Sequence, residues 1–271
     1  MELKVIGYAR NGHTDKFGIP RQSRDESPIL TRIVFEPEYC IPEALRGIEG
    51  YSHLWLLWGF SETSKNVQSD KVQSDNVQGD NGQGTKEGLS WSPTVRPPRL
   101  GGNKRMGVFA TRSPFRPNPI GLSSVRLIAI IEKGKLIQPG ISESRYHGIP
   151  TEKGTLELIV SGADVLDGTP IYDIKPYLSF SDSHEDARNG FAEETKNRTL
   201  EVVLSKGVNQ DLHRYCIGDD TVSEICYILS QDPRPGYQDD PKREYKMDYS
   251  GYTVTFVVQD GKVIVRNIYK M

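Results

Sequence analysis

Cysteine and histidine are scarce in this sequence and are spaced too far apart for the usual disulfide and metal sites. The 271 residues include three cysteines and five histidines. Cys40, Cys216 and Cys226 form no CxxC pair, which argues against a disulfide framework and a zinc ribbon. The histidines form neither HxxxH nor HExxH. We therefore expect a reduced protein without a structural metal.

Long apolar runs are also missing. No stretch approaches 18 consecutive apolar residues, and the N-terminal segment lacks the apolar core that a signal peptide carries. By default, this pattern predicts a protein of a reducing, cytoplasmic compartment that does not enter a membrane.

Several catalytic fingerprints are absent as well. Neither GxGxxG after a strand nor GxxxxGK[ST] occurs, which argues against the usual dinucleotide and triphosphate sites. The serines of GLSSV do not form a GxSxG elbow, and no histidine is placed for a triad. The sequence thus singles out no activated nucleophile.

Acidic residues are missing from one long stretch. Between Gly88 and Ile131 there is no Asp or Glu, although the net charge of the whole chain is only −2. Residues 91–121 are rich in proline and glycine, and they carry six basic residues: Arg96, Arg99, Lys104, Arg105, Arg112 and Arg116. This composition predicts a rigid, irregular cationic loop that holds an anionic or heteroaromatic ligand. The alternative is a solvated basic loop.

Short strands and frequent turns dominate the first 180 residues. Residues 51–60, YSHLWLLWGF, predict an aromatic strand buried on both faces, with His53 as a core histidine rather than a catalytic one. Residues 120–138 predict two strands joined by a Lys-Gly turn. Because no long helices alternate with the strands, the pattern favours an antiparallel β-barrel over a doubly wound sheet.

A polar, repetitive tract interrupts this pattern at residues 63–90. NVQSD, KVQSD and NVQGD recur there with a period of five. Such a composition cannot bury enough apolar surface to offset the entropy of ordering it. We interpret the tract as a disordered insertion within one domain.

A second domain is expected after a polar linker that begins near residue 181. Residues 209–216 and 221–231 predict helices, and residues 252–270 predict a hairpin with Asp260-Gly261 at its turn. The sequence therefore divides into a β-barrel domain at 1–180 and a small α+β domain at 181–271.

Three segments share the character of a binding site. Residues 20–22, PRQ, offer a guanidinium and an amide after a turn, and Arg112 offers a second guanidinium. Asp167 lies in a DGTP turn, where a carboxylate can bind a nucleoside or cap its own backbone. Together these segments predict a pocket that holds a nucleoside with turn groups and a carboxylate, and a negative charge with guanidinium groups.

The motifs that carry these segments resemble those of a known family. They are residues 96–123 (RPPRLGGNKRMGVFATRSPFRPNPIGLS), 52–60 (SHLWLLWGF), 164–178 (DVLDGTPIYDIKPYL) and 231–237 (QDPRPGY). In their order along the chain they are similar to the TsaA/TrmO family, which consists of S-adenosylmethionine-dependent tRNA methyltransferases with a β-barrel catalytic domain. The tract at 63–90 falls between these motifs.

The resemblance implies methyl transfer from S-adenosylmethionine to N6 of N6-threonylcarbamoyladenosine at position 37 of tRNA, next to the anticodon. It also implies a homodimer with the cofactor pocket near the interface. Carried over to this sequence, the cofactor-binding positions are Pro20, Arg21, Gln22, Ser61, Glu62, Arg112, Leu122, Asp167, Gly168, Thr169 and Pro170. At Ser61-Glu62 the family often has His-Gln, so this pair departs from the pattern.

Basic residues outside the cofactor set are expected to bind the tRNA anticodon loop. Arginine suits this role because its guanidinium pairs with phosphate and stacks on unpaired bases. The candidates are Arg96, Arg99, Lys104, Arg105, Arg116 and Arg234, with Lys242, Arg243, Tyr237 and Tyr245 nearby in the second domain. For residues 231–246 the alternative is a proline-rich solvated loop.

The expected reaction does not need a nucleophile or a metal from the protein. Alignment of donor and acceptor can supply several kcal/mol of the barrier reduction. A group that removes the N6 proton is not identified by the sequence, although Asp173 and Tyr177 are candidates. The unusual Ser61-Glu62 pair leaves open an RNA-binding or regulatory module without catalysis.

Overall fold

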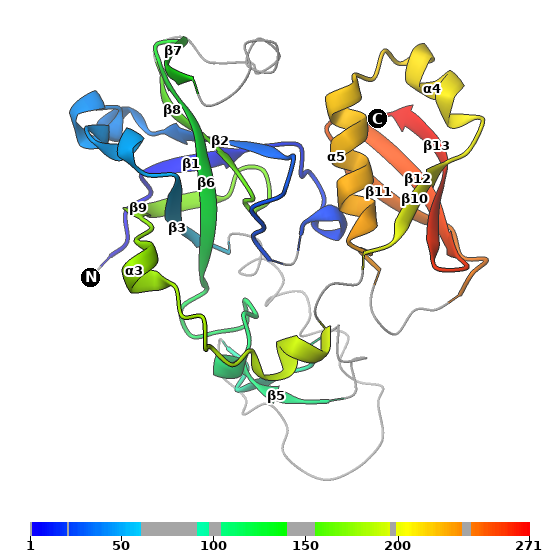
Figure 1. Ribbon diagram of the computed structural model, residues 1–271, viewed down its shortest axis with the longest axis horizontal. Helices are drawn as coiled ribbons and strands as arrows, with labels where there is room; N and C mark the ends of the chain where they lie inside the picture. Colours follow the sequence, from blue (N-terminus) through cyan, green and yellow to red (C-terminus); the bar gives the residue numbers. More distant parts are fainter. Residues whose placement is uncertain are drawn as a thin grey trace.

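A computed structural model places two β-sheet regions in this chain, joined by a segment near its N-terminus. In Figure 1 the larger, barrel-shaped region lies on the left, and a smaller region with a sheet and two helices lies on the right. The structure describes residues 2–20, 22–60, 91–97, 104–139, 155–195, 199–234 and 240–271.

Six antiparallel strands form a closed barrel, which confirms the predicted fold class. Their order is β3-β9-β1-β2-β8-β6, and β6 pairs again with β3 to close the ring. The strands are β1 (Gly7–Arg10), β2 (Leu30–Phe35), β3 (His53–Gly59), β6 (Ile120–Glu132), β8 (Leu156–Ser161) and β9 (Pro170–Pro176).

The longest of the barrel strands, β6, pairs with two neighbouring barrel strands along its length. Its first half pairs with β3, from Ile120↔Gly59 to Arg126↔His53, and its second half pairs with β8. A tight turn then leads into β7 (Lys135–Pro139). Lys133 and Gly134 both have positive φ, +51° and +74°, as a two-residue hairpin turn requires. The predicted Lys-Gly turn is confirmed.

Strand β3 shows why one sequence prediction was wrong. Leu54, Leu56 and Trp58 point into the barrel and are buried, but His53 and Trp55, which alternate with them, are only half-buried. Successive side chains of a strand point to opposite faces, so the odd-numbered residues lie on the outer surface of the barrel. The strand is not buried on both faces, and His53 is not a core histidine.

The register of the strands brings three loops to the same end of the barrel. Ser161, the last residue of β8, pairs with Leu30 at the start of β2. Pro170, at the start of β9, pairs with Tyr8 of β1, and Ile171 pairs with Trp58 near the end of β3. The connections at 11–29, 60–119 and 162–169 therefore all emerge there.

Short helices and a small two-stranded sheet decorate the barrel. Pro42 occupies the first turn of a 3₁₀ helix, where its missing N–H costs nothing. The 3₁₀ helices are η1 (Lys16–Gly18), η2 (Pro37–Tyr39), η3 (Pro42–Leu45), η4 (Ile48–Gly50), η7 (Val108–Ala110) and η8 (Gly190–Thr195), and the other elements are β4 (Thr94–Val95), β5 (Met106–Gly107) and α3 (Ser179–Asp182).

The C-terminal region is a four-stranded sheet in the order β10-β13-β12-β11 with helices packed on it. Asp260 and Gly261 have φ of +52° and +73°, so the predicted hairpin turn is confirmed. Both predicted helices are also present. The elements are β10 (Glu201–Leu204), α4 (Val208–Arg214), α5 (Asp219–Ser230), β11 (Tyr245–Tyr249), β12 (Tyr252–Gln259) and β13 (Lys262–Lys270).

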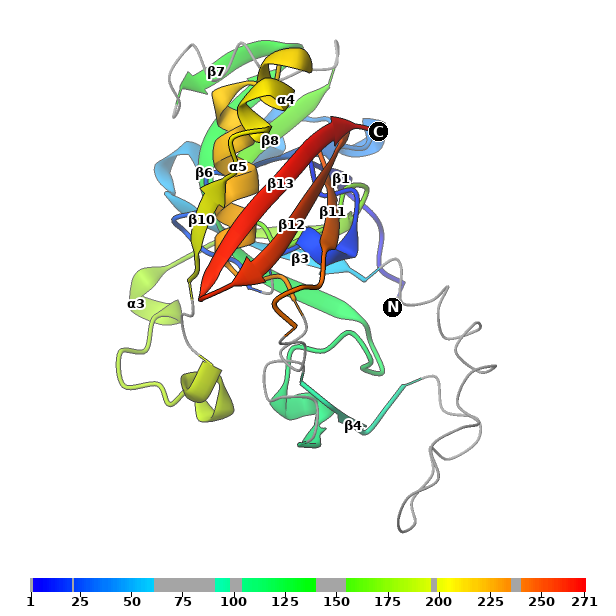
Figure 2. The ribbon, with the colours of Figure 1, turned by 90° about the vertical axis from the view of Figure 1, so that its right-hand side faces the viewer.

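The loop after β1 joins the two regions. Ile29 lies in the C-terminal hydrophobic core, and the ring of Phe17 packs against it. The Gly12 carbonyl accepts a hydrogen bond from Ser250 N at 2.8 Å. A side chain at Gly12 would collide with Tyr249, because its Cβ would lie 2.7 Å from the ring. In Figure 1, η1 (dark blue) accordingly lies between the barrel and the C-terminal region, and in Figure 2 it lies beside β11.

Candidate active site

Arg112 and Gln22 meet at the end of the barrel where the three loops emerge. The guanidinium Nη1 of Arg112 donates to Gln22 Oε1 at 2.5 Å. Ninety positions separate the two residues in the chain, so the fold brings together two of the segments predicted for the site. Both side chains are exposed, which leaves them accessible to a ligand.

The loop that carries Arg112 is held by its own backbone and by Arg116. Val108 N donates to the carbonyl of Pro93 at 3.0 Å, and β4 pairs with β5. The guanidinium of Arg116 donates to the carbonyls of Thr111 and Ser113 at 2.9 and 3.2 Å. These contacts brace the backbone on both sides of Arg112. Arg116 thus has a role inside the loop that the sequence did not suggest.

Asp167 caps a neighbouring segment rather than its own turn. Its Oδ1 accepts from the backbone N–H of Asn11 at 3.0 Å, and its Oδ2 lies 3.7 Å from Arg10 Nη1. Gly168 follows with φ of +77°, a conformation that glycine adopts without strain. The DGTP turn is therefore fixed to the end of β1, and 37% of the Asp167 side chain remains exposed.

Sequence reasoning overlooked Asp164, three residues before Asp167. Ser123 of β6 donates a short hydrogen bond to Asp164 Oδ1, and Trp58 of β3 donates to Ser123 Oγ at 2.9 Å. Burial raises the pKa of Asp164, while the Ser123 hydroxyl, the Asp164 and Ser23 backbones and the charge of Arg112 lower it. The alternation that points Ser123 inward is visible in the sequence, but its partner is not.

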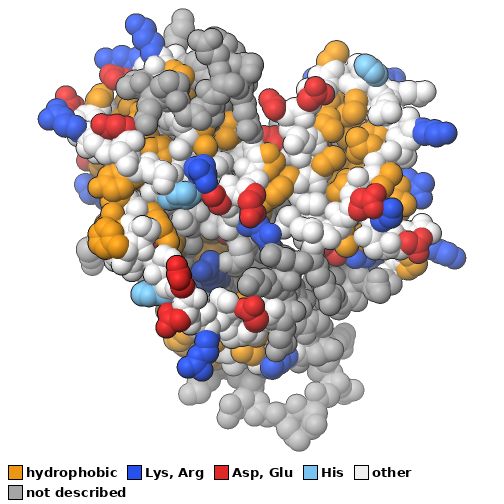
Figure 3. All heavy atoms as spheres, viewed as in Figure 1, with side chains coloured by type: hydrophobic (Ala, Val, Ile, Leu, Met, Phe, Trp, Pro, Cys, Tyr) orange, Lys and Arg blue, Asp and Glu red, His pale blue; other side chains and the backbone are white. Residues whose placement is uncertain are grey.

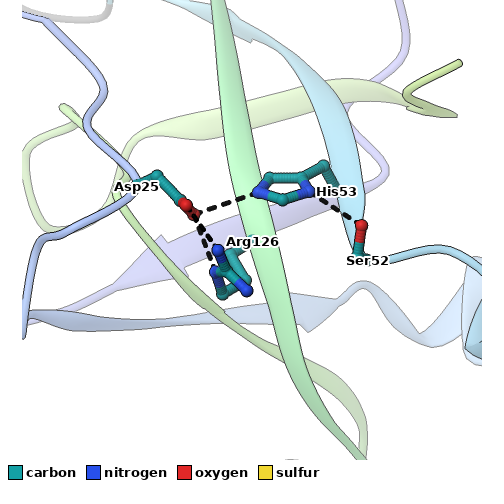
Figure 4. Close-up of polar contacts among 4 residues, drawn as sticks. All are labelled: Asp25, Ser52, His53 and Arg126. Carbon is teal, nitrogen blue, oxygen red and sulfur yellow. Dashed lines mark hydrogen bonds and ion pairs between the residues drawn. The ribbon is translucent and has the colours of Figure 1, made fainter. Parts of the chain in front are cut away.

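Residues 16–29 contain the predicted cofactor positions Pro20, Arg21 and Gln22 and are here called the cofactor loop. This loop is tied to the outer face of the barrel by Asp25 (Figure 4). Both carboxylate oxygens of Asp25 accept from Arg126, with the Arg126 Nε contact at 2.7 Å. Asp25 also lies 3.0 Å from His53 Nε2, and His53 Nδ1 lies 2.9 Å from Ser52 Oγ. The Arg126 hydrogen bond is the main cause that lowers the Asp25 pKa to about 2.

A cleft of about 150 Å³ lies on the C-terminal side of the cofactor loop. Pro20, Gln22 and Arg24 line one wall, and Ile228 and Asp232 line the other. The cleft that Pro20 and Gln22 line is thus bordered by the C-terminal region. The sequence had not indicated this contact.

Other predicted cofactor residues lie around the same barrel end. Leu122 is on the outer face of β6, opposite Leu57, and is 52% exposed. Thr169 is buried and its carbonyl accepts from Ala9 N at 2.9 Å, so its side chain does not face solvent. Pro170 begins β9 beside Tyr8.

The residues proposed for RNA contacts differ in their surroundings. Arg96 and Lys104 are exposed, and Arg105 donates to Thr94 Oγ1 at 3.2 Å. Arg234 forms a bidentate ion pair with Asp232 at 2.8 and 3.0 Å, and only 10% of its side chain is exposed. Figure 3 shows acidic and basic side chains interspersed over one face, as a net charge of −2 suggests.

The two candidates for proton removal are engaged elsewhere. Asp173 forms an ion pair with Lys175 at 2.8 Å. The ring of Tyr177 packs against His53 and Trp55, with centroids 6.1 and 5.5 Å apart. Neither contact involves Arg112 or Gln22.

Some of the predicted positions lie outside the described residues. They are Arg21, Ser61, Glu62, Arg99 and Tyr237, together with the tract at 63–90. The part of the chain that is described contains no group of three or more His, Cys, Asp or Glu that could hold a metal ion. In the same part, every helix is too short or too polar to cross a bilayer.

Comparison with known proteins decides the family. The family model for the tRNA-methyltransferase O N-terminal domain matches residues 8–183, and that for the TrmO C-terminal domain matches residues 197–271. The chain belongs to the TrmO family. The family inferred from its motifs is confirmed.

Individual TrmO relatives extend over nearly the whole chain. A tRNA (adenine(37)-N6)-methyltransferase from Escherichia coli (strain K12) is 32% identical over 266 residues, 96% of this chain and 94% of the relative. A relative from Pseudomonas aeruginosa, assigned as an S-adenosylmethionine-dependent methyltransferase, is 35% identical and covers 90% of this chain, with 86% of its own length matched. A crystal structure of TrmO from Pseudomonas aeruginosa superposes with a TM-score of 0.65 at 28% identity, over 99% of this chain and 98% of that one.

Proposed function

We propose that this chain is a tRNA methyltransferase that transfers a methyl group from S-adenosylmethionine to N6 of N6-threonylcarbamoyladenosine at position 37. The product is N6-methyl-N6-threonylcarbamoyladenosine. The observation that carries the proposal is that both TrmO domains match, while the fold brings Arg112 to Gln22 at the barrel end. The relative from Escherichia coli is named for methylation of the same base.

The described residues fit S-adenosylmethionine. Arg112 is exposed, and a guanidinium has five N–H donors, so it can bind the cofactor carboxylate while one donor contacts Gln22. The partly exposed Asp167 carboxylate suits a ribose hydroxyl, and the exposed Leu122 suits the flat face of adenine. Pro20, Gly168, Thr169 and Pro170 would shape the turns around it.

Binding and alignment are the contributions that we assign to the protein. When bound, S-adenosylmethionine would supply a methyl group on its sulfonium. N6 of the base would take this methyl in line as the carbon–sulfur bond breaks, the sulfur would leave as a neutral thioether, and the N6 proton would be lost to solvent or a base. When the protein holds the methyl donor and the acceptor nitrogen in line, the reaction barrier can fall by several kcal/mol. The braced loop around Arg112 and the turn at Gly168 provide rigid walls for this purpose.

The tRNA anticodon loop is the proposed partner. Arg96, Lys104 and Arg105 are exposed on the basic loop, residues 91–121. From this loop, guanidinium and ammonium groups can reach phosphates. Arg234 would act from the C-terminal region, beside the cleft that Pro20 and Gln22 line. We retain the division into a catalytic domain at 1–180 and an assisting domain at 181–271 as part of this proposal.

We also infer a homodimer in the cytoplasm. Three large apolar side chains in the stretch that carries Arg112 are exposed and are not assigned to the cofactor: Phe109 (71%), Phe115 (44%) and Ile120 (38%). A second copy that covers them would bury apolar surface. Sedimentation of the purified protein as a monomer at micromolar concentration would contradict this part of the proposal.

Nucleosides of cellular tRNA test the function. In cells that lack the protein, mass spectrometry should find threonylcarbamoyladenosine without its N6-methyl group. Normal levels of the methylated nucleoside would instead support the rival function, an RNA-binding or regulatory module that retains the barrel without catalysis.

A further inference from the structure

A chain of hydrogen bonds with a fixed direction ends on Asp164. The indole N–H of Trp58 can only donate, and it donates to Ser123 Oγ at 2.9 Å. The Ser123 hydroxyl then directs its own proton to Asp164 Oδ1. Trp58 and Ser123 are both buried, so losing either bond would leave a polar group without water. Asp164 Oδ1 is therefore the acceptor at the end of this chain.

Two other loops of the site act on the same carboxyl. The backbone of Ser23 forms a hydrogen bond with it, and the positive charge of Arg112 favours its ionised form. Ser23 directly follows Gln22, the residue to which Arg112 is bound. The Asp164 carboxyl therefore connects β6, the cofactor loop and the basic loop at one point.

Burial outweighs the other influences on this group, so the pKa of Asp164 lies above its ordinary value. Burial raises the pKa of Asp164, whereas the Ser123 hydroxyl, the Asp164 and Ser23 backbones and Arg112 lower it. Ser123 from β6, Ser23 from the cofactor loop and Arg112 from the basic loop are the groups that face it. Because each of them lowers the pKa of Asp164, the loss of any one should raise that pKa further.

We propose that Asp164 is a positioning residue of the methyltransferase, whose ionised carboxylate sets Arg112 and the backbone next to Gln22 in the geometry that binds the cofactor. The inference rests on the proposed function. Asp164 acts through Arg112 and the cofactor loop, and its charge is essential to that action. Asp167, by contrast, contacts Asn11 and Arg10 at the end of β1.

The variant Asp164→Asn keeps the shape of the side chain and removes its charge. We expect the Kd for S-adenosylmethionine, measured by isothermal titration on the full chain, to rise at least tenfold, and kcat/KM to fall with it. Asp248→Asn is a matched control, since Asp248 also accepts from a hydroxyl, that of Thr253 at 2.6 Å, but lies in the C-terminal sheet. It should leave the Kd unchanged.

The pH dependence separates a positioning charge from a merely structural role. Cofactor affinity of the wild type should fall as the pH drops and Asp164 takes up a proton, and this component should be missing in Asp164→Asn. Ser123→Ala removes a bond that favours the ionised form, so it should move the acid limb of the affinity profile to higher pH.

The outcomes distinguish the inference from the function on which it rests. If Asp164→Asn binds within twofold of the wild type, or keeps the same pH profile, the inference is overturned. Should that variant fail to fold, Ser123→Ala decides, and an unshifted acid limb overturns the inference. If the wild-type chain itself does not bind S-adenosylmethionine, the proposed function fails instead.

Discussion

In the proposed function, Arg112 is the residue on which cofactor binding should depend most directly. It comes from the most basic segment of the chain, and the fold places it against Gln22. A charge-assisted hydrogen bond contributes roughly 1.5–3 kcal/mol when the partner is a carboxylate. Truncation of the guanidinium should therefore weaken cofactor binding more than it lowers the free energy of unfolding.

Arg112→Ala should raise the Kd for S-adenosylmethionine by roughly ten- to hundredfold, because about 1.4 kcal/mol corresponds to a factor of ten. Isothermal titration measures it. Arg266→Ala removes an exposed guanidinium from the C-terminal sheet and serves as the control. Unchanged binding by Arg112→Ala would remove Arg112 from the cofactor site.

His13 is a second residue with a measurable signature, in this case in stability. It is fully buried against the ring of Tyr249, and neither ring nitrogen has a hydrogen-bond partner among the described residues. Burial lowers its pKa from 6.5 to about 4. The unfolded chain therefore binds a proton at a higher pH than the folded chain does, and stability is lost as the pH falls from about 6.5 towards 4.

Protonation of His13 should lower the free energy of unfolding by about 3 kcal/mol as the pH falls through this range. His13→Phe keeps an aromatic ring against Tyr249 and should abolish this component, as urea unfolding at pH 7 and pH 4.5 would show. His184→Gln, at an exposed histidine, should retain it. An equal acid loss in wild type and His13→Phe would show that His13 does not cause it.

At the scale of elements, the cofactor loop is the part of the site that the barrel must hold in place. Gln22 binds Arg112, Ser23 binds Asp164 and Asp25 binds Arg126. Three successive anchors within four residues fix this loop against β6 and the basic loop. Because the Asp25–Arg126 pair is nearly half exposed, it contributes little to the free energy of unfolding.

Arg126→Gln should thus weaken cofactor binding by roughly threefold to tenfold, about 1 kcal/mol, while the melting temperature changes little. The charge swap Asp25→Arg with Arg126→Asp should recover part of the affinity. Lys262→Gln breaks an exposed ion pair of the C-terminal sheet and is the control. Affinity equal to that of the wild type in Arg126→Gln would contradict the anchoring role. The Asp25 pKa of about 2 means that the pair stays ionised at any ordinary assay pH.

At the scale of the whole molecule, the tract at 63–90 remains a sequence prediction, because it lies outside the described residues. The barrel closes without it, since β3 and β6 pair up to Gly59↔Ile120 and Phe60 N donates to Pro119 O at 3.0 Å.

Replacing residues 63–90 by a six-residue Gly-Ser linker should leave cofactor affinity unchanged. It should raise the free energy of unfolding by roughly 1 kcal/mol, because a shorter loop loses less entropy. Thermal unfolding and isothermal titration measure both quantities. A large drop in melting temperature would show that the tract is part of the folded core.

The sequence predicted the fold and the local turns better than the contacts between distant segments. Alternating strands, the Lys133-Gly134 turn and the Asp260-Gly261 turn are local properties of the chain, and the structure contains them. By contrast, the outward side of His53 depends on where the core lies. The partners of Asp164 and Asp25 lie on other strands, at positions that only the register of the barrel defines.

The C-terminal region is similarly linked to the barrel by contacts that spacing does not reveal. A sequence boundary near residue 180 does not indicate that Phe17 and Ile29 pack into the C-terminal core. The cleft that Pro20 and Gln22 share with Ile228 is a consequence of this packing. A tRNA held across both regions would therefore meet the cofactor loop from the C-terminal side.

Incubation of the purified full chain with S-adenosylmethionine and tRNA that carries threonylcarbamoyladenosine is the most direct test of the central claim. Mass spectrometry of the digested nucleosides should show one added methyl group on N6 of that base at position 37, and none on tRNA lacking the threonylcarbamoyl group. Binding of the cofactor without any methylation of this base would contradict the account.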